Sequence, residues 1–275
     1  MTTPTQIESG DPRSSIWLPV ASLWWREVVR FYRQPSRVIG GLGSPLLFWV
    51  LIGSGIGSSF RNPAGDAEMN YLEYFFPGTL TMILLFTAIF STVSLIEDRR
   101  EGFLQAVLVA PISRGSIVLS KILGGTTLAA LQGMIFLFLL PLAGVRPSLV
   151  GLVAAVLMIV LVAFAMTGLG FLVAWPMEST QGFHSIMNLF LIPLWLLSGA
   201  LFPAEGAATA VQWVIRLNPV SYGVTGIREA LYWRGLPAGA ALLSWVTCVL
   251  VTFVFGLFTF AMSVVLALRP AGGRR

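Results

Sequence analysis

The stretch IEDRREGFLQAVLVAPISRG, from Ile96 to Gly115, separates two long apolar runs and decides how the rest of the chain is interpreted. It opens with charged residues, continues with apolar residues at helical spacing, and then reaches Pro111. A proline cannot continue a helix, because it lacks the backbone N–H and its ring clashes with the preceding turn. The pattern predicts a short amphipathic helix with a charged start. The charged residues are Glu97, Asp98, Arg99, Arg100 and Glu101, the next is Gly102, and the apolar positions are Phe103, Leu104, Val107 and Leu108.

The composition is that of an integral membrane protein. Of the 275 residues, 56% are hydrophobic and 11% are charged, whereas soluble domains carry about 25% charged residues. The net charge of +5 does not indicate nucleic acid, because basic residues in membrane proteins mark the cytoplasmic ends of helices. The single cysteine, Cys248, allows no internal disulfide and no cysteine metal cluster. The fold class we expect is an all-α membrane protein.

Six stretches reach the length of about 20 apolar residues that a membrane-crossing helix needs. None of them contains Asp, Glu, Lys or Arg, which are the residues that mark ion and proton pathways at membrane depth. A tail at residues 1–14 is expected before the connecting segment at 15–36, and a basic tail at 270–275 after the transmembrane domain at 37–269. The expected spans are 38–60, 77–96, 122–143, 149–175, 183–202 and 240–268.

The basic residues predict the orientation of these six spans. Of the 17 Lys and Arg residues, twelve fall on the side that holds both termini and the connections after the second and fourth spans, and five fall on the other side. Cytoplasmic loops carry the excess of Lys and Arg. We therefore expect both termini and the Ile96 to Gly115 stretch to lie in the cytoplasm, with the spans in the inner (plasma) membrane.

The segment SIWLPVASLWWREVVRFYRQPSR, Ser15 to Arg37, precedes the first expected span. At 100° per residue its aromatic residues Trp17 and Trp24 fall on one face, and its arginines Arg26, Arg30 and Arg33 fall nearly opposite. A helix of this kind lies at a membrane surface with its apolar face among the lipid headgroups. Whether it has a role beyond anchoring stays open at this point.

Two interpretations of the short helix after Glu101 also stay open. An amphipathic helix that projects from a membrane domain can dock in a groove of a partner, with Phe103, Leu104, Val107 and Leu108 as apolar anchors and the charges for register. The same apolar residues can instead pack against the chain's own helices.

Several functional classes lack their motifs in this sequence. A phosphate-binding loop needs GxxxxGK[ST], but the one lysine, Lys121, is followed by isoleucine. Any ATP is therefore bound by another polypeptide. His184 and Asn188 lie one turn apart, and we expect helix–helix hydrogen bonding from them rather than catalysis. We expect no enzyme activity in this chain and no catalytic, metal or cofactor-binding residues.

Three segments carry a family resemblance. They are EDRREGFLQAVLVAPISRGSIVLSKIL at residues 97–123, LWLLSGALFP at 194–203 and LNPVSYGVTGIREAL at 217–231. In this order and spacing they resemble the membrane permease subunits of ABC-2 type transporters, the group that includes daunorubicin-resistance and polysaccharide-export permeases. One departure is GFLQ at residues 102–105, where many relatives read GTLE.

The resemblance implies a specific assembly. Two cytoplasmic ATP-binding subunits would bind ATP and Mg, and a second permease copy would form a homodimer with this chain in the lipid membrane. The residues from Glu97 to Pro111 would form the coupling helix that contacts the ATPase, and the helix at 15–36 would be the interfacial connecting helix. Short re-entrant helices are implied between the fifth and sixth spans, with motif residues Ser198, Gly199, Pro203, Asn218, Pro219, Tyr222 and Arg228.

The expected function is ATP-driven export of an amphipathic, drug-like or lipid-like substrate. One alternative is export of a lipid-linked polysaccharide. An alternative of another class is a non-transporting membrane anchor or sensor that recruits a cytoplasmic ATPase.

Overall fold

In a computed structural model, the chain is described for residues 17–56, 70–202, 207–232 and 244–269. Throughout these ranges all the regular structure is helical. The helices are α1 (Trp17–Tyr32), α2 (Pro35–Ile56), α3 (Tyr71–Ser91), α4 (Val93–Arg100), α5 (Phe103–Val109), α6 (Arg114–Leu137), α7 (Leu149–Ala174), α8 (Thr180–Leu196), α9 (Thr209–Leu217), α10 (Pro219–Leu231) and α11 (Trp245–Leu268).

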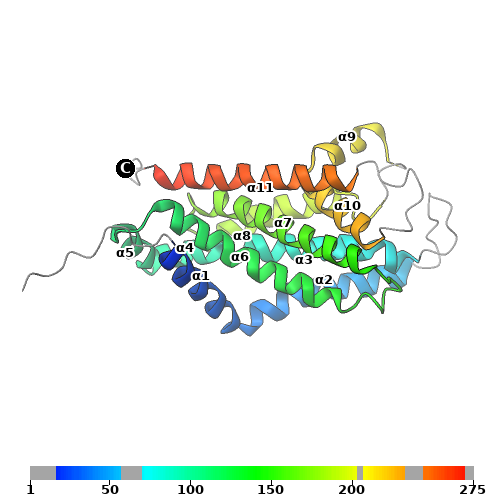
Figure 1. The fold of residues 1–275 in the computed structure, drawn as a ribbon, viewed down its shortest axis with the longest axis horizontal. Helices are drawn as coiled ribbons and strands as arrows, with labels where there is room; N and C mark the ends of the chain where they lie inside the picture. The colour runs from blue at the N-terminus through cyan, green and yellow to red at the C-terminus, as the bar shows by residue number, and fades with distance from the viewer. Residues whose placement is uncertain (1–16, 57–69, 203–206, 233–243, 270–275) are drawn as a thin grey trace, which may run out of the picture.

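The long helices form a lengthwise bundle in which α3 contacts α2, α6 and α7, and α11 contacts α7 and α10. Figure 1 shows α1, α4 and α5 at one end of this bundle, together with the C-terminal end of α11. Helices α9 and α10 lie at the opposite end. We call these the α5 end and the α10 end.

Five helical segments are long and apolar enough to cross a membrane: 38–55, 71–100, 114–137, 149–174 and 245–268. The expected span at 183–202 corresponds to α8, which has 17 residues. At 1.5 Å per residue α8 is about 26 Å long, somewhat less than a hydrocarbon core of about 30 Å. The multi-span class is confirmed, while the count of six stays a prediction.

Two helices have other ends than the spans expected on them, whose bounds stay predictions. The helix of the second begins at Tyr71 rather than at residue 77, because Glu73 lies within its first turn and does not interrupt it. The third runs from Arg114 to Leu137 rather than over 122–143. Its start is set by Ser113, whose hydroxyl accepts a hydrogen bond from the backbone N–H of Ser116. The end of the first expected span and the first residues of the sixth lie outside the described ranges.

Polar caps start most of the other long helices too. Side-chain oxygens of Ser148, Ser179 and Ser244 each accept a hydrogen bond from a backbone N–H three residues later. The first N–H groups of a helix have no partner within the helix, so a serine at this position satisfies one of them. Apolar helices therefore begin at defined residues even though hydropathy changes gradually along the chain.

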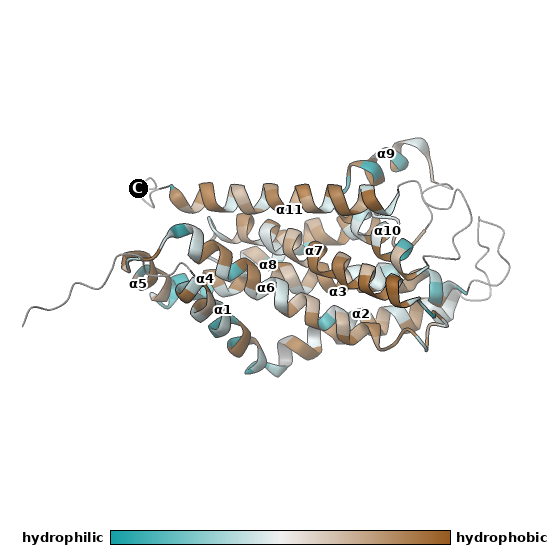
Figure 2. Cartoon of the chain, viewed as in Figure 1, coloured by the Kyte–Doolittle hydropathy of each residue, from teal (hydrophilic) through white to brown (hydrophobic). Residues whose placement is uncertain are grey.

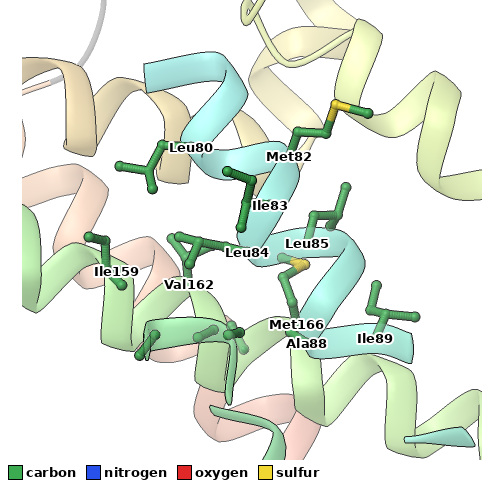
Figure 3. Packing of buried hydrophobic residues seen from close by; sticks show 14 of the residues in the cluster. Leu80, Met82, Ile83, Leu84, Leu85, Ala88, Ile89, Ile159, Val162 and Met166 are labelled. Carbon is green, nitrogen blue, oxygen red and sulfur yellow. The ribbon is translucent and has the colours of Figure 1, made fainter. Parts of the chain in front are cut away.

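Helix α3 is the centre of the core. Leu80 and Leu84 of α3 are fully buried, and Figure 3 shows them on the side of Ile159 and Val162 of α7. In a lipid environment helices associate through close van der Waals packing rather than through the hydrophobic effect. The interdigitation of α3 with α6 and α7 therefore holds the bundle together.

The outer helices present apolar side chains to their surroundings. Leu51 of α2 is 67% exposed and Val254 of α11 is 61% exposed. Figure 2 shows hydrophobic colour along most of the long helices, with hydrophilic patches gathered near the bundle ends. This distribution is typical of a multi-pass membrane protein, whose outer faces contact lipid or another apolar subunit.

The central role of α3 gives a stability test. Leu84→Ala removes a fully buried side chain and is expected to lower the free energy of unfolding by about 2–5 kcal/mol, because the core cannot close over the cavity. Leu157→Ala on α7 is the matched control, since Leu157 is 44% exposed. Thermal unfolding of the detergent-solubilised chain measures both. An equal loss in the two variants would contradict the packing described here.

Candidate functional site

Charged side chains from three helices meet at the α5 end around Asp98 of α4. Asp98 is fully buried. Its Oδ1 accepts hydrogen bonds from Nη2 of Arg26 and Nη1 of Arg30, both at 2.7 Å. Its Oδ2 pairs with Nζ of Lys121 on α6 and accepts a further bond from Nη1 of Arg26 at 3.1 Å. One carboxylate thus joins α1, α4 and α6.

A second buried carboxylate, Glu27 of α1, completes the arrangement. Its Oε1 lies 2.7 Å from Nζ of Lys121, and its Oε2 accepts a hydrogen bond from the hydroxyl of Ser94 at 2.7 Å. Arg30 also donates to Glu97 at 2.9 Å. We call this set the ion-pair cluster. Its members are Arg26, Glu27, Arg30, Glu97, Asp98 and Lys121.

The charges of the ion-pair cluster balance. Within the set, three carboxylates face three cationic groups. The exposed carboxylate of Glu101 lies 3.6 Å from Arg30 at the edge of the cluster. The pKa of the Arg26 guanidinium is raised above its ordinary value, chiefly by its hydrogen bonds to Asp98. A buried charge is tolerated only when it is paired, and removal of one partner is strongly destabilising. The cluster therefore resists separation of α1, α4 and α6.

The structure shows what the arginines of α1 contact. Arg26 and Arg30 both reach α4 of the same chain. The Arg26 guanidinium also lies over the Phe103 ring, 3.6 Å from its centroid. Trp24 donates from its indole N–H to the Thr127 hydroxyl at 3.0 Å and so faces α6. Of the residues predicted for the connecting helix, Trp17 on α1 and Arg33 just after it are exposed.

The apolar face of α5 packs inward. Leu104 is 3% exposed and Val107 is 9% exposed, and both belong to the chain's own core. Phe103 and Leu108 are partly buried against the same core. Of the two interpretations that the sequence left open, packing against the chain's own helices is therefore correct for these residues. The side chains that remain outward on this segment are Arg100, Glu101, Gln105, Ala106, Val109 and Pro111.

The backbone conformation of one glycine and the hydrogen bonds of one arginine side chain fix the position of α5. Gly102, between α4 and α5, has a φ of 77°, a left-handed conformation that glycine adopts without a steric penalty. Arg99 donates from Nη1 to the carbonyl of Met177 at 2.9 Å and from Nη2 to that of Trp175 at 2.5 Å. The α4–α5 segment is thereby also fastened to the turn between α7 and α8.

The predicted re-entrant motif residues come together at the α10 end. Asn218 donates from Nδ2 to the carbonyls of Leu194 and Leu197 at 2.6 and 2.9 Å, while its Oδ1 accepts from the N–H of Val220 at 2.9 Å. The Asn218 side chain thus satisfies backbone carbonyls at the end of α8 and caps the first turn of α10. Pro219 follows at the first position of α10, where its missing N–H costs nothing.

Gly199 and Arg228 form the second contact between these motifs. Gly199 has a φ of 77°, and its carbonyl accepts from Arg228 Nη2 at 3.1 Å. The Arg228 guanidinium also lies 4.5 Å from the centroid of the Tyr74 ring on α3. Ser198 is buried and bonds to a backbone carbonyl of its own turn, and Tyr222 bonds to the carbonyl of Arg216. Pro203 lies outside the described residues.

A pocket of about 420 Å³ lies between α1, α2, α3, α4, α6 and α8. His184 and Asn188 of α8 line it, and the His184 ring lies 4.7 Å from that of Phe90. Both residues thus lie on a pocket wall, and their expected helix–helix hydrogen bonding stays a prediction. No sequence motif indicated the pocket, because its lining comes from six separate helices. Its other lining residues include Glu27, Arg30, Gly40, Gly41, Ser44, Met82, Phe86, Thr87, Ser91, Ser94 and Leu128.

Comparison with known proteins agrees with this architecture. The sequence profile of the ABC-2 type transporter family matches residues 20–232. A protein of Cyanophora paradoxa named as a transport permease, ycf38, is 29% identical over 206 residues, which are 74% of this chain and 70% of that protein. Nodulation protein J of Neorhizobium galegae is 26% identical over 229 residues, with 78% and 79% covered.

A third relative is the daunorubicin resistance ABC transporter permease protein of Streptomyces coeruleorubidus. It is 24% identical over 214 residues, which cover 76% of this chain and 73% of that protein. The matched residues run from α1 through α10 and include the ion-pair cluster and both motifs at the α10 end. The chain therefore belongs to the ABC-2 type transporter family of membrane permeases.

Proposed function

We propose that the chain is the membrane subunit of an ATP-driven exporter that works with two cytoplasmic ATP-binding subunits and a second permease copy. ATP and Mg would be bound by those partner subunits. In this proposal α8 counts as the fifth of six spans in the inner (plasma) membrane, the α5 end faces the cytoplasm, and both termini are cytoplasmic. The observation that carries the proposal is the ion-pair cluster.

The cluster provides a path for force. A partner that contacts the exposed face of α5 would move α4 and α5 together, because Gly102 joins them through a tight connection. Asp98 would pass this movement to α1 and α6 through its paired cations. Arg99 would pass it to the α7–α8 turn. Coupling of this kind requires contacts that move as a unit, and buried hydrogen-bonded charges supply them.

An amphipathic substrate fits the rest of the molecule. The expected spans contain no Asp, Glu, Lys or Arg. The pocket lined by His184 and Asn188 is largely apolar, with a few hydroxyl and amide groups. One relative is named for resistance to daunorubicin, which supports a drug-like class. These observations favour export of a small amphipath over that of a long polysaccharide.

The exporter proposal is tested in proteoliposomes that hold the permease and its ATP-binding subunit. We expect ATP-dependent movement of daunorubicin or of a fluorescent phospholipid across the bilayer. ATP hydrolysis without movement of either probe would contradict export and favour a membrane anchor for the ATPase. A permease preparation without the ATP-binding subunit serves as the control.

Uncoupling tests the force path. Arg30→Gln removes the charge that pairs with both Glu97 and Asp98 and is expected to lower the number of molecules moved per ATP by at least about fivefold, since a charge-assisted hydrogen bond contributes about 1.5–3 kcal/mol. Arg33→Gln is the matched control, because Arg33 is exposed one turn away. Hydrolysis and probe movement are measured on the same vesicles. Equal ratios in both variants would show that the cluster does not transmit force.

Partner docking tests the exposed face of α5. Val109 is 88% exposed, so Val109→Asp leaves the core intact and is expected to reduce co-purification of the ATP-binding subunit by about tenfold, because it places a charge in an apolar contact. Leu149→Asp, at an exposed position that begins α7, is the control and should leave co-purification unchanged. Full recovery of the ATP-binding subunit with the Val109 variant would move the docking surface elsewhere.

A further inference from the structure

We propose that the exposed face of α1 binds anionic phospholipids of the cytoplasmic leaflet, and that this contact sets how tightly ATP hydrolysis is coupled to transport. The lipid contact is a property of the chain by itself. Its effect on coupling rests on the proposed function.

Large apolar and aromatic side chains cover the outward side of α1. Four of them are exposed, and at 100° per residue they fall within an arc of about 100° on the helix. They are Trp17 at 70%, Leu18 at 74%, Trp25 at 59% and Tyr32 at 63%. We call this set the outer face of α1. A contiguous apolar surface of this kind marks a contact with a membrane or a partner.

The charged side chains of α1 point the other way and are already in use. Arg26 and Arg30 donate to Asp98 of α4. Glu27 pairs with Lys121 of α6. A rotation of α1 that buried the outer face would break these ion pairs, and breaking a buried pair is strongly destabilising. The outer face therefore stays outward, and what covers it is not the core of this chain.

Helix α1 crosses α6 at the level where α6 enters its apolar run. Lys121 pairs with Glu27, and the Thr127 hydroxyl accepts from the Trp24 indole at 3.0 Å. A Cβ built on Gly124 would lie 2.9 Å from Cβ of Glu27, so the two helices are closely packed between these contacts. From Ile122 to its end, α6 has no charged residue.

This level is that of the lipid headgroups. A charged residue followed by an apolar run marks the boundary between headgroups and hydrocarbon, and Trp and Tyr are enriched at that boundary. Figure 1 shows α1 at the α5 end, inclined to the long axis of the bundle. A helix that lies at this level with an aromatic face outward fits the interface of a bilayer.

The charge beside the outer face is positive. Arg33 directly follows α1 and is exposed, and none of the ion pairs among the described residues involves it. Between residues 13 and 40 the one acidic residue is Glu27, which is buried. The cytoplasmic leaflet carries the anionic lipids, which attract Lys and Arg at its surface. Charge complementarity therefore selects an anionic phospholipid over a neutral one.

The same helix carries three members of the ion-pair cluster, Arg26, Glu27 and Arg30. A headgroup bound at the outer face holds α1 against the leaflet, so that a movement of α4 acts on a fixed support. By linkage, a lipid that binds one arrangement of α1 better also favours the matching arrangement of the cluster. Coupling is therefore expected to be tighter in an anionic membrane.

Photolabelling of the full chain in lipid nanodiscs tests the lipid contact without ATP or the ATP-binding subunit. The nanodiscs hold an equal mixture of phosphatidylglycerol and phosphatidylcholine, and each lipid in turn carries a diazirine near its headgroup. We expect the phosphatidylglycerol probe to label α1 peptides at least about fivefold more than the phosphatidylcholine probe, which is the preference that one arginine near an anionic surface gives. Equal labelling by the two probes, or no label on α1, would overturn the proposal.

Arg33 is expected to carry the headgroup preference. Arg33→Gln should lower the labelling ratio about fivefold, while Arg33→Lys should retain it, because the attraction depends on charge. Arg146→Gln, which removes an exposed arginine between α6 and α7, is the control and should leave the ratio unchanged. The same ratio in Arg33→Gln as in the unchanged chain would overturn the assignment to Arg33.

Trp25→Glu tests the outer face. Trp25 and Trp213 of α9 are both 59% exposed, so Trp213→Glu at the α10 end is the matched control. Trp25→Glu should reduce labelling of α1 by both probes at least about threefold, since it places a negative charge in the lipid contact. Thermal unfolding should change little in either variant, because both side chains are exposed. Equal labelling of α1 in the two variants would place the lipid elsewhere and overturn the proposal.

The effect on coupling is measured in proteoliposomes that also hold the ATP-binding subunit. The number of molecules moved per ATP should be at least about fivefold higher in the equal lipid mixture than in phosphatidylcholine alone, and Arg33→Gln should remove this difference. In phosphatidylcholine alone Arg33 meets no anionic headgroup, so Arg33→Gln should there behave as the unchanged chain does. The same number in both lipid compositions would overturn the regulation.

The two proposals fail in different ways. Labelling of α1 by phosphatidylglycerol together with no ATP-dependent movement of any transport probe would contradict export and leave the lipid site. ATP-dependent movement that is independent of lipid composition and of Arg33 would support export and overturn the regulation by lipid.

Discussion

The architecture depends on the burial of one carboxylate. Asp98 is fully buried and accepts hydrogen bonds or ion pairs from three cations on two other helices. A buried charge must be fully paired, so Arg26, Arg30 and Lys121 have little freedom of position. That requirement sets the place of α1 beside α4 and α6, and it sets the direction in which α5 leaves the bundle. As a result of that direction, the face of α5 that carries Gln105 and Val109 is exposed.

Local features of this region could be predicted from the sequence. The apolar spacing and Pro111 predicted the short helix, and the charged residues at its start predicted a polar cluster. The pairing could not be predicted, because Arg26 and Asp98 are 72 residues apart and a helical wheel shows no partner from another segment. The helical wheel showed only that the arginines of α1 share one face. The only sequence signal available was the presence of acidic and basic residues in two segments that were expected on the same side of the membrane.

Hydropathy predicted the membrane class and most of the spans. The residues at which the helices begin and end are set by capping side chains and by hydrogen bonds between helices. Ser113 starts α6 eight residues before the apolar run was expected to begin. At the α10 end, the motif residues Gly199, Asn218 and Arg228 were identified from the resemblance alone. Their mutual contacts come from the fold, which brings the carbonyls at the end of α8 to the start of α10. The pocket was invisible in the sequence for the same reason.

Glu27 and Arg30 connect the two sites, since each belongs both to the ion-pair cluster and to the pocket wall. Any movement of α1 relative to α4 therefore changes the shape of the pocket. By linkage, a molecule that binds one shape better shifts the cluster toward the corresponding arrangement, and a partner that shifts the cluster changes the affinity of the pocket by the same factor. A charged molecule in the pocket would compete for the ion pairs that Glu27 and Arg30 make, so the pocket and the ion-pair cluster depend on the same two side chains.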